Sequence, residues 1–292
     1  MNQTNEKKIS EKKTVGYGLG PVDTVLSVDE VDREAARLAA EGPSRKRLSE
    51  LVDQEPILTI EGLRAGYGKM MVLHDFNMQV GAGQSLCMIG PNGAGKSTAL
   101  HSIYGFTTIT GGAVKVRDKD ITRLTPNQKL KNAGIAYILQ DASIFPEMTV
   151  EENMLMGGYL MEKPSQAKEA AEKVLARYPR LAERRNQHAG VLSGGERRLL
   201  EISRALIMEP DVLLVDEPSI GLEPRFIEMV FEILDDLQHN EGKTIIMVEQ
   251  NAKKGLEFSD IGYVLVSGQL AMADTGDALL EDPEVGRLFL GG

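Results

Sequence analysis

Residues 90–98 have the spacing G-x-x-x-x-G-K-[ST], which is typical of a loop that binds the phosphates of a nucleoside triphosphate. An apolar run, Ser85–Ile89, precedes the motif and predicts the strand that leads into such a loop. Glycines allow turns that bring N–H groups onto phosphate oxygens, and the following helix directs its positive end at the anion. The predicted nucleotide-binding residues are Gly90, Pro91, Asn92, Gly93, Ala94, Gly95, Lys96, Ser97 and Thr98.

Within this motif, two side chains have specific expected partners. Lys96 should reach the β- and γ-phosphates, and the hydroxyl of Ser97 should bind Mg²⁺. The alternative is a glycine-rich turn that binds nothing, which the motifs further along the chain make less attractive.

Two adjacent carboxylates end a second apolar run, Val212–Val215. In a parallel α/β sheet, that end of the strand faces the nucleotide crevice. We expect Asp216 to belong to the Mg²⁺ shell and Glu217 to orient and deprotonate the attacking water. A simple Asp-Glu cap before a helix is the alternative.

A Ser-Gly-Gly sequence precedes the predicted helix Arg197–Ile207. The hydroxyl of Ser193, the N–H groups of Gly194 and Gly195 and the helix dipole together predict a second anion site. An ordinary serine cap with a flexible glycine pair is the alternative in isolation. Beside the P-loop and the carboxylate pair, the combination is specific.

The remaining pattern predicts an α/β fold with a P-loop NTPase core, an antiparallel β-subdomain and an inserted helical subdomain. Residues 1–55 form an N-terminal extension that is partly helical, with one helix capped by Ser27 and a second from Ser44. The nucleotide-binding domain spans residues 56–292, and the helical insertion spans about residues 142–194. A disordered extension with a docking helix and a regulatory extension both remain open.

Composition narrows the class of protein. The chain has 292 residues, 42% of them hydrophobic, and a formal net charge of −10, which argues against nucleic acid as the main partner. Its one cysteine, Cys87, lies in an apolar run and predicts a buried thiol in a reducing compartment. Neither a membrane-spanning run nor a secretion signal is visible, so any membrane association requires other subunits.

At this point the chain resembles the nucleotide-binding subunit of ATP-binding cassette (ABC) transporters, over residues 56–292. The resemblance implies that Tyr67 stacks on adenine and that Gln140 reaches Mg²⁺ and the attacking water. It also implies that residues 192–196 are the family signature, which closes on ATP held by the opposite subunit. A head-to-tail dimer of two cassettes, identical or different, follows from this arrangement.

Two positions depart from the common family pattern. Gln250 stands where a histidine is usual, and Glu223 stands where aspartate is usual. A glutamine can hydrogen-bond a γ-phosphate but cannot take up a proton near neutral pH, which leaves Glu217 as the stronger candidate for the base. Both variations resemble the importer branch for branched-chain amino acids, urea and amides.

The resemblance therefore implies a subunit that binds and hydrolyses ATP with Mg²⁺ and powers import of a small polar solute. Its implied partners are separate membrane permeases and, indirectly, a solute-binding protein, at the cytoplasmic face of the inner membrane. The alternatives are the ATPase of a lipid or lipopolysaccharide exporter and a soluble ATP-driven clamp. Met148, Met154, Met156 and Met161 either fill gaps in the core or form a surface that receives a membrane subunit.

Overall fold

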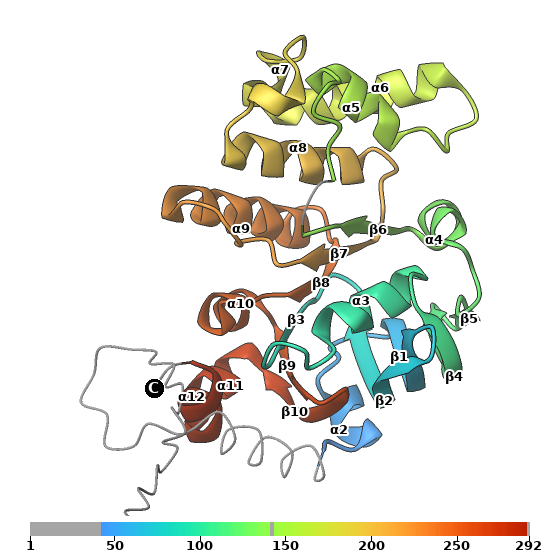
Figure 1. Cartoon of the computed structure of the whole chain (residues 1–292), viewed down its shortest axis with the longest axis vertical. Helices are drawn as coiled ribbons and strands as arrows, with labels where there is room; N and C mark the ends of the chain where they lie inside the picture. Colours follow the sequence, from blue (N-terminus) through green and yellow to red (C-terminus); the bar gives the residue numbers. More distant parts are fainter. Residues whose placement is uncertain (1–41, 141–142, 291–292) are drawn as a thin grey trace, which may run out of the picture.

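A computed structural model describes residues 42–140 and 143–290 (Figure 1). The helix expected from Ser27 lies outside these residues. The helix expected from Ser44 is α2, Arg45–Glu50, and Ser44 caps it by accepting a hydrogen bond from the N–H of Arg47.

Two β-sheets organise the described chain. The antiparallel sheet has the strand order β2-β1-β4-β5, and the second sheet has the order β10-β9-β3-β8-β7-β6. The first contains β1 (Pro56–Tyr67), β2 (Met70–Gly81), β4 (Thr108–Val116) and β5 (Lys119–Asp120). The second contains β3 (Ser85–Ile89), β6 (Ile135–Ile138), β7 (Val212–Asp216), β8 (Thr244–Val248), β9 (Ile261–Val266) and β10 (Gln269–Thr275). In this second sheet, all neighbours pair in parallel except β9 and β10.

Helices cover the second sheet, and a further group of helices lies beyond one end of it. The helices near the sheet are α3 (Lys96–Tyr104), α4 (Pro126–Ala133), α8 (Gly194–Leu206), α9 (Pro224–His239), α10 (Ala252–Phe258), α11 (Gly276–Glu281) and α12 (Pro283–Phe289). Between β6 and α8 the chain forms α5 (Val150–Gly157), α6 (Pro164–Arg177), α7 (Pro179–Ala182) and a short 3₁₀ turn, Ala189–Val191. These helices gather beyond α8, at the end of the molecule opposite α2 and α12 (Figure 1).

The parallel strands are buried on both faces, and successive residues point to opposite sides. In β3, Leu86 and Met88 pack in the core shared with α3 and the antiparallel sheet. Cys87 and Ile89 pack in the other core, beneath α8, α9 and α10. The prediction of a buried thiol is thus confirmed, and burial raises the pKa of Cys87 above its ordinary value.

One sequence-based boundary was wrong. The signature helix begins at Gly194 rather than Arg197, because Ser193 and Glu196 form a capping box that starts the helix despite the low helix propensity of glycine. Beyond β10, the helices α11 and α12 are capped by Thr275 and Asp282.

Helix α3, which continues the P-loop, is anchored at its far end by a buried lysine. Lys129 of α4 donates from Nζ to the carbonyl oxygens of Ile103 at 2.6 Å and Ser102 at 3.5 Å. A cation at a helix C-terminus also opposes the negative end of the dipole. Burial lowers the pKa of Lys129 to about 8.

Helix α2 packs on the fold rather than lying free. Leu48 is 1% exposed in the core that includes β1 and β2. We expect Leu48→Ala to lower the free energy of unfolding by about 2–5 kcal/mol, because it removes buried methyl groups and leaves a cavity. Lys46, whose side chain is 86% exposed in the same helix, is the control, and Lys46→Ala should change stability by less than about 0.5 kcal/mol. Equal losses for the two variants in urea unfolding would contradict the packing of α2.

The buried ammonium of Lys129 predicts a pH dependence. Its pKa is about 8 in the folded chain against a model-peptide value of 10.5, so the unfolded chain binds more protons between these values. Stability contributed by this group is therefore present above pH 10.5 and is lost as the pH falls through 8. The unfolding free energy of the wild type minus that of Lys129→Met should rise over this window in urea titrations. A difference that stays constant with pH would contradict the shift.

Candidate functional site

The loop between β3 and α3 has the backbone geometry of a phosphate cradle. Gly90, Gly93 and Gly95 have φ angles of +142°, +82° and +99°, which side chains disfavour. A Cβ on Gly90 would lie 2.1 Å from the carbonyl oxygen of Leu265, so β9 approaches too closely for any other residue. Gly95 leads directly into α3, whose N-terminus therefore points into this loop.

Lys96 folds back over the same loop. Its Nζ donates to the carbonyl oxygens of Gly90 at 2.8 Å and Pro91 at 3.0 Å. Burial lowers the pKa of Lys96, and the carboxylates of Glu217 and Asp216 oppose that shift. The ammonium thus lies within the cradle, where it can reach an anion that the loop binds.

Two of the three residues expected to hold a metal ion, Ser97 and Asp216, are in contact. Ser97 Oγ donates to Asp216 Oδ1 at 3.0 Å, and Tyr137 donates its hydroxyl to Asp216 Oδ2 at 2.8 Å. Hydroxyl and carboxylate oxygens are ligands that Mg²⁺ prefers, and neighbouring ligands of an octahedral ion at about 2.1 Å lie about 3 Å apart. The donors therefore fit Mg²⁺. Sequence analysis did not anticipate Tyr137, whose pKa is raised by burial and by Asp216.

Glu217 lies beside the third expected member of the site. Gln140 donates from Nε2 to Glu217 Oε2 at 3.1 Å, so its amide oxygen remains an acceptor or ligand. Glu217 has a φ angle of +44°, which is unusual for a residue with a side chain. Its N–H donates to the carbonyl of Val248 at 2.8 Å, which attaches this turn to the end of β8.

Tyr67, at the end of β1, is 39% exposed next to a group of aromatic rings. Its hydroxyl forms a hydrogen bond with Nδ1 of His101 on α3. The ring of His101 makes edge contacts with Phe106 and Tyr137, and Tyr137 in turn bonds Asp216. A chain of contacts therefore connects the expected adenine platform to the carboxylate of Asp216, and His101 is a member that sequence analysis missed.

The signature residues form a tight helix start. Ser193 accepts a bond at Oγ from the N–H of Glu196 at 3.3 Å and donates its own hydroxyl to Glu196 Oε2 at 2.9 Å. A Cβ on Gly195 would lie 2.1 Å from the ring of Phe226 on α9, so glycine permits this close packing. Gly194 lines a cavity of about 440 Å³ together with Gln140 and Glu217.

The predicted site residues therefore form two groups. The P-loop, Asp216, Gln140 and Glu217 are connected by the contacts above, whereas Ser193 and Gly195 belong to the start of α8. Arg198, on the first turns of α8, bridges the two groups by donating to the carbonyls of Leu139 at 2.7 Å and Asp216 at 3.2 Å. Gln250 follows β8 with an exposed side chain, and its neighbour Glu249 is buried.

Comparisons with known proteins agree with this geometry. Residues 73–220 match the family described as ABC transporter. The high-affinity branched-chain amino acid transport ATP-binding protein BraG of Pseudomonas aeruginosa is 41% identical over 236 residues, covering 81% of this chain and 100% of BraG. The lipopolysaccharide export system ATP-binding protein LptB of Haemophilus influenzae is 31% identical over 237 residues, covering 80% of this chain and 97% of LptB.

Solved structures agree as well. A nucleotide-free ATP-binding cassette from an ABC transporter has a TM-score of 0.72 and 30% identity, covering 81% of this chain and all of its own. The ADP conformation of such a cassette gives a TM-score of 0.72 and 31% identity over 82% of this chain. Among the described residues, every helix is too short or too polar to cross a bilayer. By its family match, its relatives and its fold, this chain belongs to the ABC transporter family, as an ATP-binding subunit with ATP hydrolase activity.

Proposed function

We propose that this subunit powers import of a small polar solute, of the branched-chain amino acid, urea or amide type, through separate membrane permeases. The proposal of an ATPase site rests on the contacts that join the P-loop, Asp216, Gln140 and Glu217 at one edge of the parallel sheet. The 41% identity to a branched-chain amino acid transport protein supports the solute class. In this proposal the subunit works at the cytoplasmic face of the inner membrane, where it contacts those permeases.

In the proposed mechanism, the N–H groups of the P-loop bind phosphate oxygens. Lys96 exchanges its two carbonyl partners for the β- and γ-phosphates. Tyr67 stacks on the adenine. Ser97, Asp216 and the amide oxygen of Gln140 hold Mg²⁺, which neutralises charge on the phosphates when bound.

Glu217 orients the attacking water and accepts its proton, held for this by the bond from Gln140. Gln250, at the switch position, donates a hydrogen bond to the γ-phosphate without taking up a proton. Glu217 thus acts as the base, and Gln250 senses the γ-phosphate of the nucleotide.

Two cassettes assemble head to tail in the proposed complex, as a homodimer or with a related subunit. The residues Ser193, Gly194 and Gly195 then face ATP held by the opposite cassette, since their helix dipole and N–H groups suit an anion. ATP binding closes the dimer and hydrolysis opens it, which gives the permeases a two-state motor.

A surface beside the site suits the permease contact. A cavity of about 290 Å³ between α4, α5 and α8 is lined by Phe145, Met156 and Tyr159, whose side chains are exposed. Met154 is fully buried and belongs to the core. Of the methionines singled out in the sequence, Met156 is therefore the one that supports an adaptable contact surface.

The role of Glu217 predicts a separation between binding and turnover. Glu217→Gln keeps the shape of the side chain but removes the base, so turnover should fall by more than about 100-fold while ATP affinity persists. Steady-state ATPase rates and equilibrium binding of a fluorescent ATP analogue measure the two quantities. Wild-type turnover in this variant would refute the assignment.

Lys96→Ala provides the opposite pattern. Loss of the cation that lies in the cradle should weaken ATP binding by at least about tenfold, in the same binding assay. Unchanged affinity would show that the phosphates bind elsewhere.

The transport proposal predicts the partners of the native subunit. Purification from gently solubilised membranes should recover membrane permeases with a second cassette, identified by mass spectrometry. Export permeases for lipopolysaccharide would instead favour the second candidate, which the similarity to LptB supports. Recovery only in the soluble fraction, with ribosomes, would contradict both.

A further inference from the structure

Beneath the proposed catalytic turn lies a buried carboxylate that the mechanism above does not use. Glu249 follows β8 directly and is 1% exposed. Its Oε1 accepts from Ser219 Oγ at 2.7 Å and from the N–H of Asn251 at 2.8 Å, and its Oε2 accepts from the N–H of Ser219 at 3.2 Å. Both oxygens are therefore satisfied by two loops that are far apart in the sequence.

These bonds secure the turn that carries Glu217. On one side of Pro218, the N–H of Glu217 donates to the carbonyl of Val248 at 2.8 Å. On the other side, Ser219 is held twice by Glu249. Residues at the end of β8 thus hold the turn on both sides of Pro218. These bonds explain how Glu217 keeps a φ angle of +44°.

Dense packing keeps the carboxylate in this position. A Cβ on Gly255 of α10 would lie 3.0 Å from Glu249 Cβ and 2.6 Å from Cys87 Sγ. The backbone of α10 therefore packs directly against the Glu249 side chain and against Cys87 of β3. The same side chain also holds Asn251, the residue after Gln250, so it fixes the two loops relative to each other.

We propose that Glu249 is a positioning residue for ATP hydrolysis, which sets Glu217 and the loop from Ser219 against the Gln250 switch. This inference rests on the proposed role of Glu217. Loss of the carboxylate leaves the phosphate cradle intact but lets the base move, and a small displacement of a catalytic group lowers the rate of the chemical step. Glu249 therefore acts on turnover rather than on nucleotide affinity.

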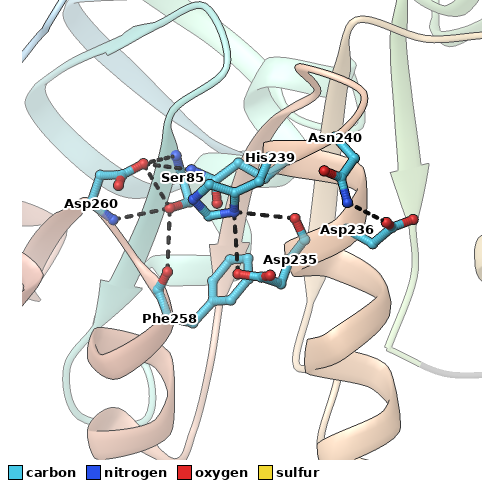
Figure 2. Close-up of polar contacts among 8 residues, drawn as sticks. Ser85, Asp235, Asp236, His239, Asn240, Phe258 and Asp260 are labelled. Atoms are coloured by element: carbon cyan, nitrogen blue, oxygen red, sulfur yellow. Dashed lines mark hydrogen bonds and ion pairs between the residues drawn. The ribbon is translucent and has the colours of Figure 1, made fainter.

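The chain offers a control carboxylate at the opposite end of the same sheet, on the exposed residue Asp260. Asp260 accepts from Ser85 N at 2.8 Å, from Ser85 Oγ at 3.0 Å and from Gln238 Nε2 at 2.6 Å. Figure 2 shows Asp260 beside Ser85, the first residue of β3, close to Phe258 and the end of α9. Its carboxylate thus makes the same pair of bonds to a serine, away from the nucleotide edge.

The test compares Glu249→Gln with Asp260→Asn in the purified full-length chain. In Glu249→Gln, an amide nitrogen replaces one of two accepting oxygens and cannot accept its bond from Ser219. In Asp260→Asn, the charge is lost but the amide oxygen can keep the bonds that Oδ2 accepts. We expect Glu249→Gln to lower kcat by roughly 10- to 100-fold with an unchanged KM for ATP. Asp260→Asn should lower the melting temperature and leave kcat within about twofold of the wild type.

Ser219→Ala removes the hydroxyl that donates to Glu249 and leaves both Glu249 and the backbone N–H of Ser219 in place. It should lower kcat with an unchanged KM, and the double variant should lose less than the sum of the two single losses, because both substitutions weaken the contact between Ser219 and Glu249. This variant decides the question if Glu249→Gln does not fold.

Wild-type kcat in Glu249→Gln, a loss equal to that of Asp260→Asn, or additive losses in the double variant would overturn the positioning role. Glu217→Gln, measured in parallel, separates the two proposals. If that variant retains turnover, the proposed base is wrong; if it is inactive while Glu249→Gln is normal, only the inference about Glu249 fails.

Discussion

The parallel pairing of β6, β7, β8 and β3 is the constraint on which the site depends. Parallel strands end at the same edge, so Gln140, Asp216, Glu249 and the P-loop emerge together although the chain separates them widely. Burial on both faces fixes this register. A shift by one residue would turn Cys87 and Ile89 toward the wrong core and move every strand end.

At this edge, polar contacts connect residues at the ends of neighbouring strands into one network. Tyr137 on β6 holds Asp216 on β7, and Gln140 holds Glu217. Arg198 binds the carbonyls at the ends of both strands from α8. Helix α8 and the carboxylate of Asp216 are thus mechanically connected within one subunit. A displacement of α8 can therefore be transmitted to the site through Arg198, without any change in the P-loop itself.

Much of this arrangement could be predicted from the sequence because its signals are local. The strand before the P-loop, the strand before Asp216 and the helix capped by Thr125 each depend on neighbouring residues. Tyr137, His101 and Glu249 could not be found in this way. Each acquires its partner only when distant segments meet, and nothing in their local spacing distinguishes them from ordinary core or surface residues.

Contacts within the P-loop have a further consequence for the way this protein selects its ligand. The ammonium of Lys96 is already satisfied by two peptide carbonyls of the loop that should receive the nucleotide. The carbonyl oxygens of Gly90 and Pro91 therefore compete with the nucleotide for the ammonium of Lys96. Nucleotide binding becomes an exchange of acceptors, and its driving force is the difference between a phosphate oxygen and a carbonyl rather than the full strength of a new ion pair. A ligand that contacts the loop but not Lys96 leaves both carbonyl bonds intact. Such a ligand gains no binding energy from the positive charge of the ammonium.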